Sequence, residues 1–227
     1  MLALGPEASD ACFDLGSLVL VGKFKYRAAL CIGSNHRRSF QPRGGLNNPG
    51  LTTPPSAYAR LMSARPIPEP IAPGQESVWD YPRPPVIRTS AEEIIVILGG
   101  VEIFQTRISL RMLETGHPPT YYLPRSTFIE GSLRPARGTS FCEWKGRAAY
   151  VDVIGGSRVA ARGAWYYPHP HARYAAIVDH VGIYAGAMDE CLVDGERVVP
   201  QPGGYYGGWI TSTVTGPFKG EPGTEDW

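Results

Sequence analysis

The chain has 227 residues, 43% of them hydrophobic, and a formal net charge of +1. This length and apolar content can build a sizeable core, so the composition excludes disorder of the whole chain. The charge is unevenly divided, because residues 15–68 carry basic but no acidic side chains, whereas residues 69–227 have a slight acidic excess. An acidic C-terminal part argues against a nucleic-acid groove there, since phosphate binding needs a basic surface.

The first third of the chain has no sustained periodicity. The apolar run at residues 15–22 is too short to span a bilayer and follows acidic residues, so neither a membrane span nor a signal peptide is predicted. Residues 1–61 are predicted to be a basic, disordered extension, or to result from the choice of start site, with Met62 as the alternative start. Residues 62–75 are rich in proline and are predicted to form an extended linker.

Cysteine spacing indicates a reducing compartment. The four cysteines are Cys12, Cys31, Cys142 and Cys191. No two of them form a CxxC pair, which indicates free thiols and a cytoplasmic location. A structural zinc ion usually needs close ligand pairs, and the close pair His169 and His171 lies in a proline-rich loop, where solvated turn residues are the simpler interpretation. No metal site is therefore predicted.

From residue 76 onward, short apolar runs alternate with turn residues. Three hairpins are expected, with strands at 93–98 and 101–106 around Gly99-Gly100, at 139–144 and 148–154 around Lys145-Gly146, and at 190–193 and 197–199 around Asp194-Gly195. Helical patterning is weak and allows one short helix at 126–133, capped by Ser126, and another at 172–179. The pattern predicts a mainly β protein of compact antiparallel sheets with one or two short helices. No βαβ alternation is present, which disfavours a dinucleotide-binding sheet.

The segment before the second turn holds several candidate functional residues. If residues 140–145 form a strand, Cys142 and Trp144 share one face, and Glu143 and Lys145 share the other. In a cleft, Glu143 and Lys145 could move a proton or hold a polar ligand; on an open face they would be an ordinary exposed ion pair. Cys142 is expected to pack in the core, because free cysteines are among the most buried side chains.

Residues 113–124 combine an acid, a histidine and paired tyrosines around a rigid Pro-Pro turn. Glu114 and His117 can act as an acid/base pair if this loop lines a cleft, although His-Pro-Pro is also a sufficient turn device. Neighbouring strand residues point to opposite faces, so at most one of Tyr121 and Tyr122 faces a given pocket.

Aromatic residues and glycines are concentrated in the C-terminal body. In Tyr205-Tyr-Gly-Gly-Trp209 the glycines predict a close backbone approach or unusual φ, with a bulge as the alternative. Strand parity also separates Tyr166 from Trp165 and Tyr167. The rings predicted to wall a ligand pocket are Tyr121, Trp144, Trp165, Tyr166, Tyr206 and Trp209. The residues predicted to supply its catalytic chemistry are Glu114, Glu143 and Lys145.

Several motifs in a fixed order carry a resemblance to a known family. They lie at residues 76–85, 113–115 with 118–124, 141–146, 164–168, and 206–211 with 216–220. Together they resemble the domain-of-unknown-function family 427 over residues 76–227. The resemblance implies a compact antiparallel β domain similar to the tent-shaped fold of methionine sulfoxide reductase B and the cereblon ligand-binding domain. Some proteins of that fold bind zinc through paired cysteines, which are missing here.

The family also bears a nucleotidyltransferase label. Such enzymes hold Mg²⁺ with paired aspartates after a Gly-Ser turn, whereas Gly156-Ser157 is followed here by Arg158 and Val159. Three functions therefore stay open: a small-molecule-binding β domain that is also an enzyme or only a binder, a Mg²⁺-dependent nucleotidyltransferase, and a scaffold whose exposed rings bind a protein. The expected partner is an unidentified small molecule rather than nucleic acid or membrane, and the sequence leaves cofactors and oligomeric state undetermined.

Overall fold

A computed structural model describes residues 66–224 and 227. The predicted extension at 1–61 and residues 62–65 of the predicted linker lie outside the described residues. The described chain is mainly β, as predicted, and its strand pairs are antiparallel except for one parallel pair. None of the helices in this part of the chain has the length and apolar run needed to cross a bilayer.

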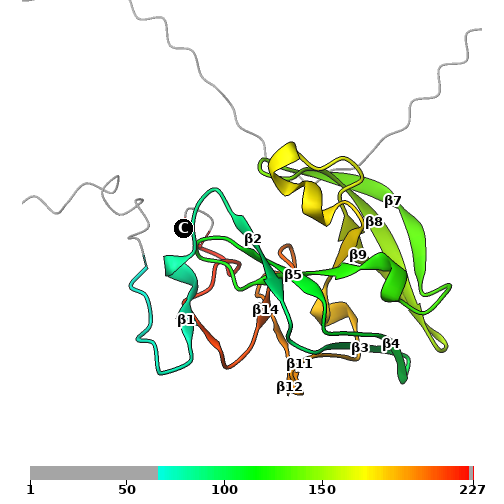
Figure 1. Ribbon diagram of the computed structural model, residues 1–227, viewed down its shortest axis with the longest axis horizontal. Helices are drawn as coiled ribbons and strands as arrows, with labels where there is room; N and C mark the ends of the chain where they lie inside the picture. Colours follow the sequence, from blue (N-terminus) through cyan, green and yellow to red (C-terminus); the bar gives the residue numbers. More distant parts are fainter. Residues whose placement is uncertain (1–65, 225–226) are drawn as a thin grey trace, which may run out of the picture. The chain divides into compact units, whose positions relative to one another are not determined.

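The largest sheet has seven strands in the order β2-β5-β6-β10-β9-β8-β7 (Figure 1). These strands are β2 (Val86–Ser90), β5 (Ser109–Leu113), β6 (Thr120–Pro124), β10 (His180–Ile183), β9 (Arg158–Tyr166), β8 (Gly146–Gly155) and β7 (Leu133–Cys142). A second sheet has the order β12-β11-β3-β4. Its strands are β12 (Glu196–Arg197), β11 (Glu190–Val193), β3 (Ile94–Leu98) and β4 (Val101–Thr106).

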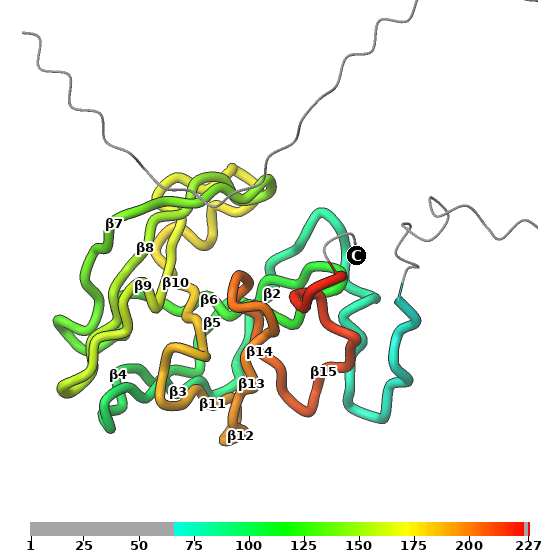
Figure 2. Tube along the Cα trace, turned by 180° about the vertical axis from the view of Figure 1, so that it is seen from behind, coloured from blue at the N-terminus to red at the C-terminus, as the bar shows by residue number. Residues whose placement is uncertain are grey.

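Two short strand pairs complete the sheets of the described residues. They are the parallel pair β1 (Glu76–Ser77) and β15 (Val214–Thr215), and the antiparallel pair β13 (Val199–Pro200) and β14 (Trp209–Ile210). Figure 2 shows the last strands, in orange and red, beside the first described residues, in cyan. Glu69 strengthens this junction: its backbone N–H donates to the Gly216 oxygen at 2.9 Å, and its carboxylate accepts from the Gly216 N–H at 3.1 Å. The division of the chain into extension, linker and domain stays a prediction, as does the tent-shaped architecture.

Two of the predicted hairpins form around the expected dipeptides. Gly99 and Gly100 have φ values of 61° and 72°, a region that favours glycine, and they join β3 to β4. Asp194 and Gly195, with φ values of 47° and 80°, likewise join β11 to β12. Short-range turn chemistry was therefore sufficient to locate both hairpins.

The β7–β8 hairpin differs from the prediction in its turn. β7 ends at Cys142, which pairs with Gly146, so residues 143–145 form the turn instead of continuing the strand. Gly146 has a φ of 97°, which lets the chain re-enter β8 directly after Lys145. The alternation of faces predicted for residues 140–145 consequently stops at Cys142.

The main core joins the four-stranded sheet to one face of the seven-stranded sheet. Val96 and Leu98 of β3 are fully buried in one cluster with Leu123 of β6 and Val181 of β10. In Figures 1 and 2, β3, β4 and β11 lie together below β8 and β9. A second cluster contains Tyr122, the neighbour of Leu123, so it occupies the opposite face of the large sheet.

The described helices are short and of the 3-10 type. They are η2 (Val78–Asp80), η3 (Arg125–Thr127), η4 (Ala172–Ile177) and η5 (Ala185–Ala187). The helix predicted at 126–133 is reduced to η3, because β7 already begins at Leu133. The predicted Ser126 cap is wrong, since Pro124 occupies the N-cap position and no side chain caps this turn.

Candidate functional site

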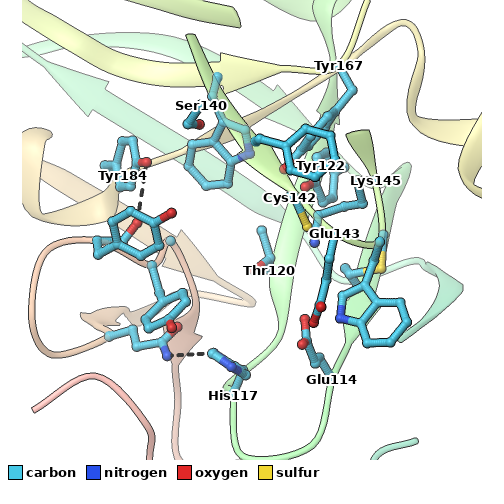
Figure 3. A pocket seen from close by; sticks show the side chains of 18 of the residues that line it. Glu114, His117, Thr120, Tyr122, Ser140, Cys142, Glu143, Lys145, Tyr167 and Tyr184 are labelled. Carbon is cyan, nitrogen blue, oxygen red and sulfur yellow. Dashed lines mark hydrogen bonds between the residues drawn. The ribbon is translucent and has the colours of Figure 1, made fainter. Parts of the chain in front are cut away.

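A cavity of about 480 Å³ opens on the face of the seven-stranded sheet that carries the second cluster (Figure 3). We call it the ring pocket. Its principal lining residues are Arg83, Glu114, His117, Thr120, Tyr122, Cys142, Glu143, Trp144, Lys145, Trp165, Tyr167, Tyr184, Gln201, Tyr205, Tyr206 and Lys219. The volume falls within the range of sites that hold small organic molecules.

Aromatic rings form one wall of the ring pocket. The Trp165 indole of β9 lies 4.5 Å from the Tyr184 ring, centroid to centroid, and the rings of Tyr205 and Tyr206 lie 5.0 Å apart. A Cβ added at Gly207 would lie 2.0 Å from the Trp165 ring. The predicted close approach at this glycine is therefore confirmed, because any side chain would displace the indole.

The polar wall is built by the β7–β8 turn. The His171 Nδ1–H donates to the Trp144 carbonyl at 2.8 Å, and the His171 backbone N–H donates to the Lys145 carbonyl at 3.1 Å. Held in this way, Glu143, Trp144 and Lys145 line the cavity together with Cys142. Cys142, predicted to pack in the core, packs against the second core cluster but is only half-buried, and it also lines the ring pocket.

Lys145 brings a positive charge into the ring pocket. Burial opposes this charge, but the neighbouring Tyr122, Cys142 and Glu114 outweigh burial and raise the pKa of the ammonium above its usual value. The Nζ atom also lies 6.0 Å from the centre of the Tyr167 ring. Lys145 is consequently a cation at neutral pH, suited to holding an anion rather than accepting a proton.

The phenol groups around Lys145 keep their protons. Burial raises the pKa of the Tyr122 and Tyr167 hydroxyls well above the usual value, so both are neutral at physiological pH. Burial likewise raises the pKa of Tyr184, to about 12. These hydroxyls can donate hydrogen bonds to a bound molecule.

Two carboxylates face one another across the cavity. Figure 3 shows the side chains of Glu114 and Glu143 pointing toward each other from different turns. The Glu114 carboxylate lies 3.9 Å from Arg83 Nη2, whereas Glu143 is exposed. Paired carboxylates beside a cavity can take up and return a proton, or accept hydrogen bonds from an amine or hydroxyl.

His117 is buried at the edge of the cavity. Its Nδ1 lies 2.9 Å from Gln201 Nε2, and its ring centre lies 4.6 Å from that of Tyr206. Burial above all, with the charges of Lys219, Arg83 and Lys145, lowers the pKa of His117 to about 3. The imidazole is therefore neutral at physiological pH, so any acid/base partnership with Glu114 does not use an imidazolium.

The structure gathers most of the predicted site residues in the ring pocket. Those that line it are Glu114, Glu143, Trp144, Lys145, Trp165 and Tyr206. The remaining predicted rings, Tyr121, Tyr166 and Trp209, belong to the main core or its edge. Strand parity is the reason for the first two, since Tyr122 and Tyr167 occupy the face that lines the pocket.

Each misplaced ring has its own partner outside the ring pocket. The Trp209 Nε1–H donates to the Ile183 carbonyl at 3.0 Å within the core. Tyr166 lies under the guanidinium of Arg125, 4.4 Å from its carbon. The prediction that these rings wall the pocket is corrected accordingly.

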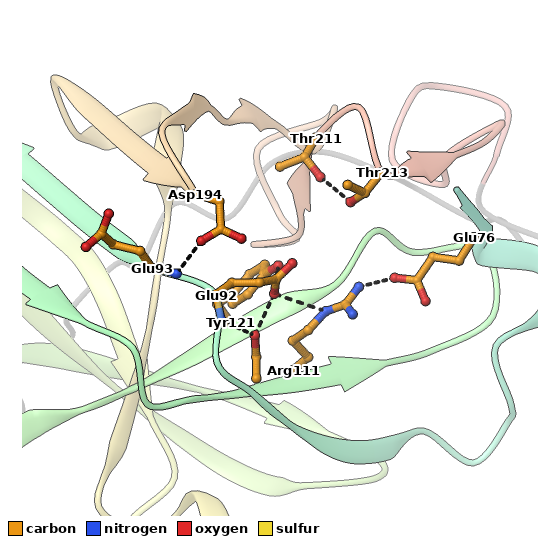
Figure 4. Close-up of polar contacts among 9 residues, drawn as sticks. Glu76, Glu92, Glu93, Arg111, Tyr121, Asp194, Thr211 and Thr213 are labelled. Carbon is orange, nitrogen blue, oxygen red and sulfur yellow. Dashed lines mark hydrogen bonds and ion pairs between the residues drawn. The ribbon is translucent and has the colours of Figure 1, made fainter. Parts of the chain in front are cut away.

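Tyr121 belongs to a separate charged network, which we call the Arg111 cluster (Figure 4). Its hydroxyl donates to Glu92 Oε2 at 2.8 Å, and Arg111 Nε lies 3.9 Å from the same oxygen. The other end of the Arg111 guanidinium donates to Glu76. This cluster joins β5, β6 and the N-terminal strand β1, and its charged groups bind one another.

Sequence reasoning missed several pocket residues. Tyr167 could have been found from Trp165, because residues two apart share a strand face. Gln201, Arg83 and Lys219 gave no such signal, since each is brought to the cavity by a distant loop. Within the described residues, no group of three or more His, Cys, Asp or Glu side chains is arranged to hold a metal ion.

Comparison with known proteins gives a family but no activity. Residues 86–194 match the family model NTP_transf_9, whose description is Domain of unknown function (DUF427). A comparison with curated proteins found no match. The matched segment contains the β7–β8 turn and Trp165, whereas Tyr206 and Gln201 lie beyond it.

Proposed function

We propose that the ring pocket binds a small organic molecule and transfers a proton to or from it. Residues 86–194 of this chain match the DUF427 family model. The observation that carries the proposal is the convergence of Glu114, Glu143 and Lys145 on one ring-lined cavity. These three residues come from two separate turns. Nothing in the pairing of the strands requires their side chains to meet.

The aromatic wall supports the binding part of the proposal. Trp165, Tyr184 and Tyr206 offer flat faces, and a planar molecule lying against them would remove apolar surface from water. The opposite wall offers carboxylates, an ammonium group and neutral hydroxyls. A ligand with a flat body and a polar edge fits this division.

The charge arrangement supports the proton-transfer part. Glu143 is the exposed carboxylate of the pair and can accept a proton from an acidic C–H, N–H or O–H of the ligand. The negative charge left on the ligand would be stabilised by the Lys145 ammonium. Return of the proton from Glu143 to another ligand atom would complete an isomerisation or elimination without any further reagent.

The binding proposal is tested by native mass spectrometry of the purified protein, followed by extraction and identification of any retained molecule. Wild-type protein should carry a small molecule that is reduced or missing in Trp144→Ala and Glu143→Gln. Ile129→Ala serves as the matched control, because Ile129 is exposed and does not line the ring pocket. Equal retention by all four proteins would contradict a ligand site in this cavity.

Titration calorimetry distinguishes this proposal from nucleotidyl transfer, the activity in the family label. Each of the four nucleoside triphosphates is titrated with Mg²⁺ into the full chain. We expect no saturable heat, because no Asp-x-Asp pair accompanies the ring pocket. Saturable binding of one nucleotide that depends on Mg²⁺ would favour nucleotidyl transfer instead.

The proposal includes a cytoplasmic, reducing location. The supporting observation is the free Cys142 thiol at the cavity wall, which an oxidising compartment would expose to disulfide formation.

A further inference from the structure

The orientation of one buried amide can be read from its backbone partners. The Oε1 atom of Gln201 accepts from the Gly208 backbone N–H at 3.1 Å, and a backbone N–H can only donate. The Nε2 atom donates to the Lys219 carbonyl at 2.7 Å, and a carbonyl can only accept. A flipped amide would lose both bonds, so the positions of oxygen and nitrogen are fixed.

This amide in turn fixes the proton on His117. Gln201 Nε2 is a donor, and it lies 2.9 Å from His117 Nδ1, so Nδ1 must be the acceptor. A neutral imidazole that accepts at Nδ1 carries its hydrogen on Nε2. Among the described residues, none accepts a hydrogen bond from Nε2.

A second donor at the same cavity also has no acceptor. The indole Nε1 of Trp144 is buried and makes no hydrogen bond within the described part of the chain. A buried donor without an acceptor is costly, so the Trp144 indole beside this cavity indicates that a bound molecule supplies an acceptor there.

The charges near His117 favour a negatively charged acceptor. Burial is the main cause of the lowered pKa of His117, and the positive charges of Lys219, Arg83 and Lys145 add to it. One neighbouring carboxylate, Glu114, is already engaged at 3.9 Å by Arg83. Lys219 is engaged as well, because its Nζ donates to the Trp227 carbonyl oxygen at 3.1 Å. Lys145 lines the cavity and forms no ion pair among the described residues, so it suits an anionic oxygen group better than an amine.

We propose that His117 is a fixed Nε2–H donor of the ring pocket and that the pocket takes a planar organic acid, whose carboxylate oxygen accepts from His117. Gln201 is then a positioning residue, since it acts only through the imidazole. The ligand class rests on the proposed function of the cavity. The tautomer of His117 does not rest on that function, so experiments can test the tautomer and the ligand class separately.

The tautomer is tested by nuclear magnetic resonance on the full chain labelled with ¹⁵N in its histidines. The ¹⁵N shifts distinguish a protonated ring nitrogen from an unprotonated one, and His117→Asn identifies the signals. We expect a protonated Nε2 and a bare Nδ1 at pH 7. In Gln201→Glu the carboxylate cannot donate, so Nδ1 should become protonated. A protonated Nδ1 in wild-type protein would overturn the proposal, whether or not Gln201→Glu folds.

The ligand class is tested with benzoate and benzylamine, which share a ring and differ in the charge of the polar group. Benzoate should bind more tightly than benzylamine and should shift the His117 Nε2 signal. The affinity for benzoate should fall about tenfold or more in His117→Asn, which keeps an acceptor for Gln201 but loses the Nε2 donor. His117→Gln, whose amide places a donor near the Nε2 position, should recover part of that loss.

The outcomes separate the two proposals. Tighter binding of benzylamine, or equal benzoate affinity in wild type and His117→Asn, would overturn the organic-acid class while leaving a ligand site in place. Binding of neither probe, together with no retained molecule in the mass spectrometry above, would overturn both the class and the proposed function.

Discussion

Two polar clusters of this protein contain similar residue types but differ in how their charged groups and hydrogen-bond donors are paired. In the Arg111 cluster, Arg111 lies between Glu76 and Glu92, and Tyr121 donates to Glu92 (Figure 4). Each charge therefore has a partner of opposite sign, although Arg111 Nε, 3.9 Å from Glu92, makes no hydrogen bond. In the ring pocket, by contrast, neither the buried Trp144 Nε1–H nor His117 Nε2 has an acceptor among the described residues, and the carboxylates border an open volume. The difference teaches that charges and rings alone do not indicate function; unmatched partners around a cavity do.

Replacing Arg111, the cation of the Arg111 cluster, should have the largest effect on stability. Arg111→Met should lower the free energy of unfolding by about 3 kcal/mol, because Glu76 and Glu92 lose their counter-charge. Urea denaturation measures this loss. The matched control is Arg88→Met, since Arg88 is the exposed strand partner of Arg111 and should change stability little. Similar losses in both variants would show that the Arg111 cluster is not a structural unit.

The second prediction concerns the pH dependence of stability. The folded pKa of His117, about 3, lies below the unfolded value of about 6.5, so the unfolded chain binds a proton first as pH falls. The contribution of neutral His117 to the free energy of unfolding is therefore complete above pH 6.5 and is lost as the pH falls toward 3. Between pH 6.5 and 4.5, wild type should lose about 2 kcal/mol relative to His117→Asn. Parallel stability curves for the two proteins would show that His117 is not buried as a neutral group.

The glycine contact against Trp165 gives the next largest effect. Gly207→Ala places a Cβ 2.0 Å from the indole and should cost about 1 to 2 kcal/mol through overpacking, while distorting the aromatic wall. Gly186→Ala is the control, because its Cβ meets the nearest atom at an ordinary 3.5 Å. Thermal unfolding and near-UV circular dichroism report the two effects. An unchanged spectrum in Gly207→Ala would mean that the wall adapts.

The smallest effect on stability is expected at Glu143, the carboxylate proposed to transfer a proton. Glu143→Gln should change the free energy of unfolding by less than about 0.5 kcal/mol, because Glu143 is exposed. Glu92→Gln should cost more, since it weakens contacts with both Arg111 and Tyr121. If chemical denaturation shows equal losses, the two clusters do not differ in the way proposed here.

The fold was predictable where local chemistry sets it. The Gly99-Gly100 and Asp194-Gly195 turns adopt the positive φ that these residue types allow, so two hairpins and the mainly β class followed from short segments. The β7–β8 turn was misjudged because His171, far along the chain, fixes its carbonyls. A contact between segments so far apart in the sequence does not change the local pattern of residue types, so periodicity cannot predict it.

The sequence predicted which residue types form the candidate site better than it predicted which strand face lines the cavity. Alternation correctly separated Trp165 from Tyr166, but it could not tell which face meets the four-stranded sheet and which borders the cavity. Tyr121 and Trp209 were consequently assigned to the pocket although they lie in the main core. The choice between faces depends on which sheet packs on which side, and that is a property of the assembled domain.

The sequence by itself determined two of the hairpins, the opposition of neighbouring rings and the family resemblance, because strand geometry and turn conformation act over a few residues. Only the tertiary structure decided that Glu114, Glu143 and Lys145 share a cavity, and that Gln201 sets the proton of His117. Those relations join turns and loops that are distant along the chain. The packing of the sheets brings them together, and burial then determines which groups stay charged.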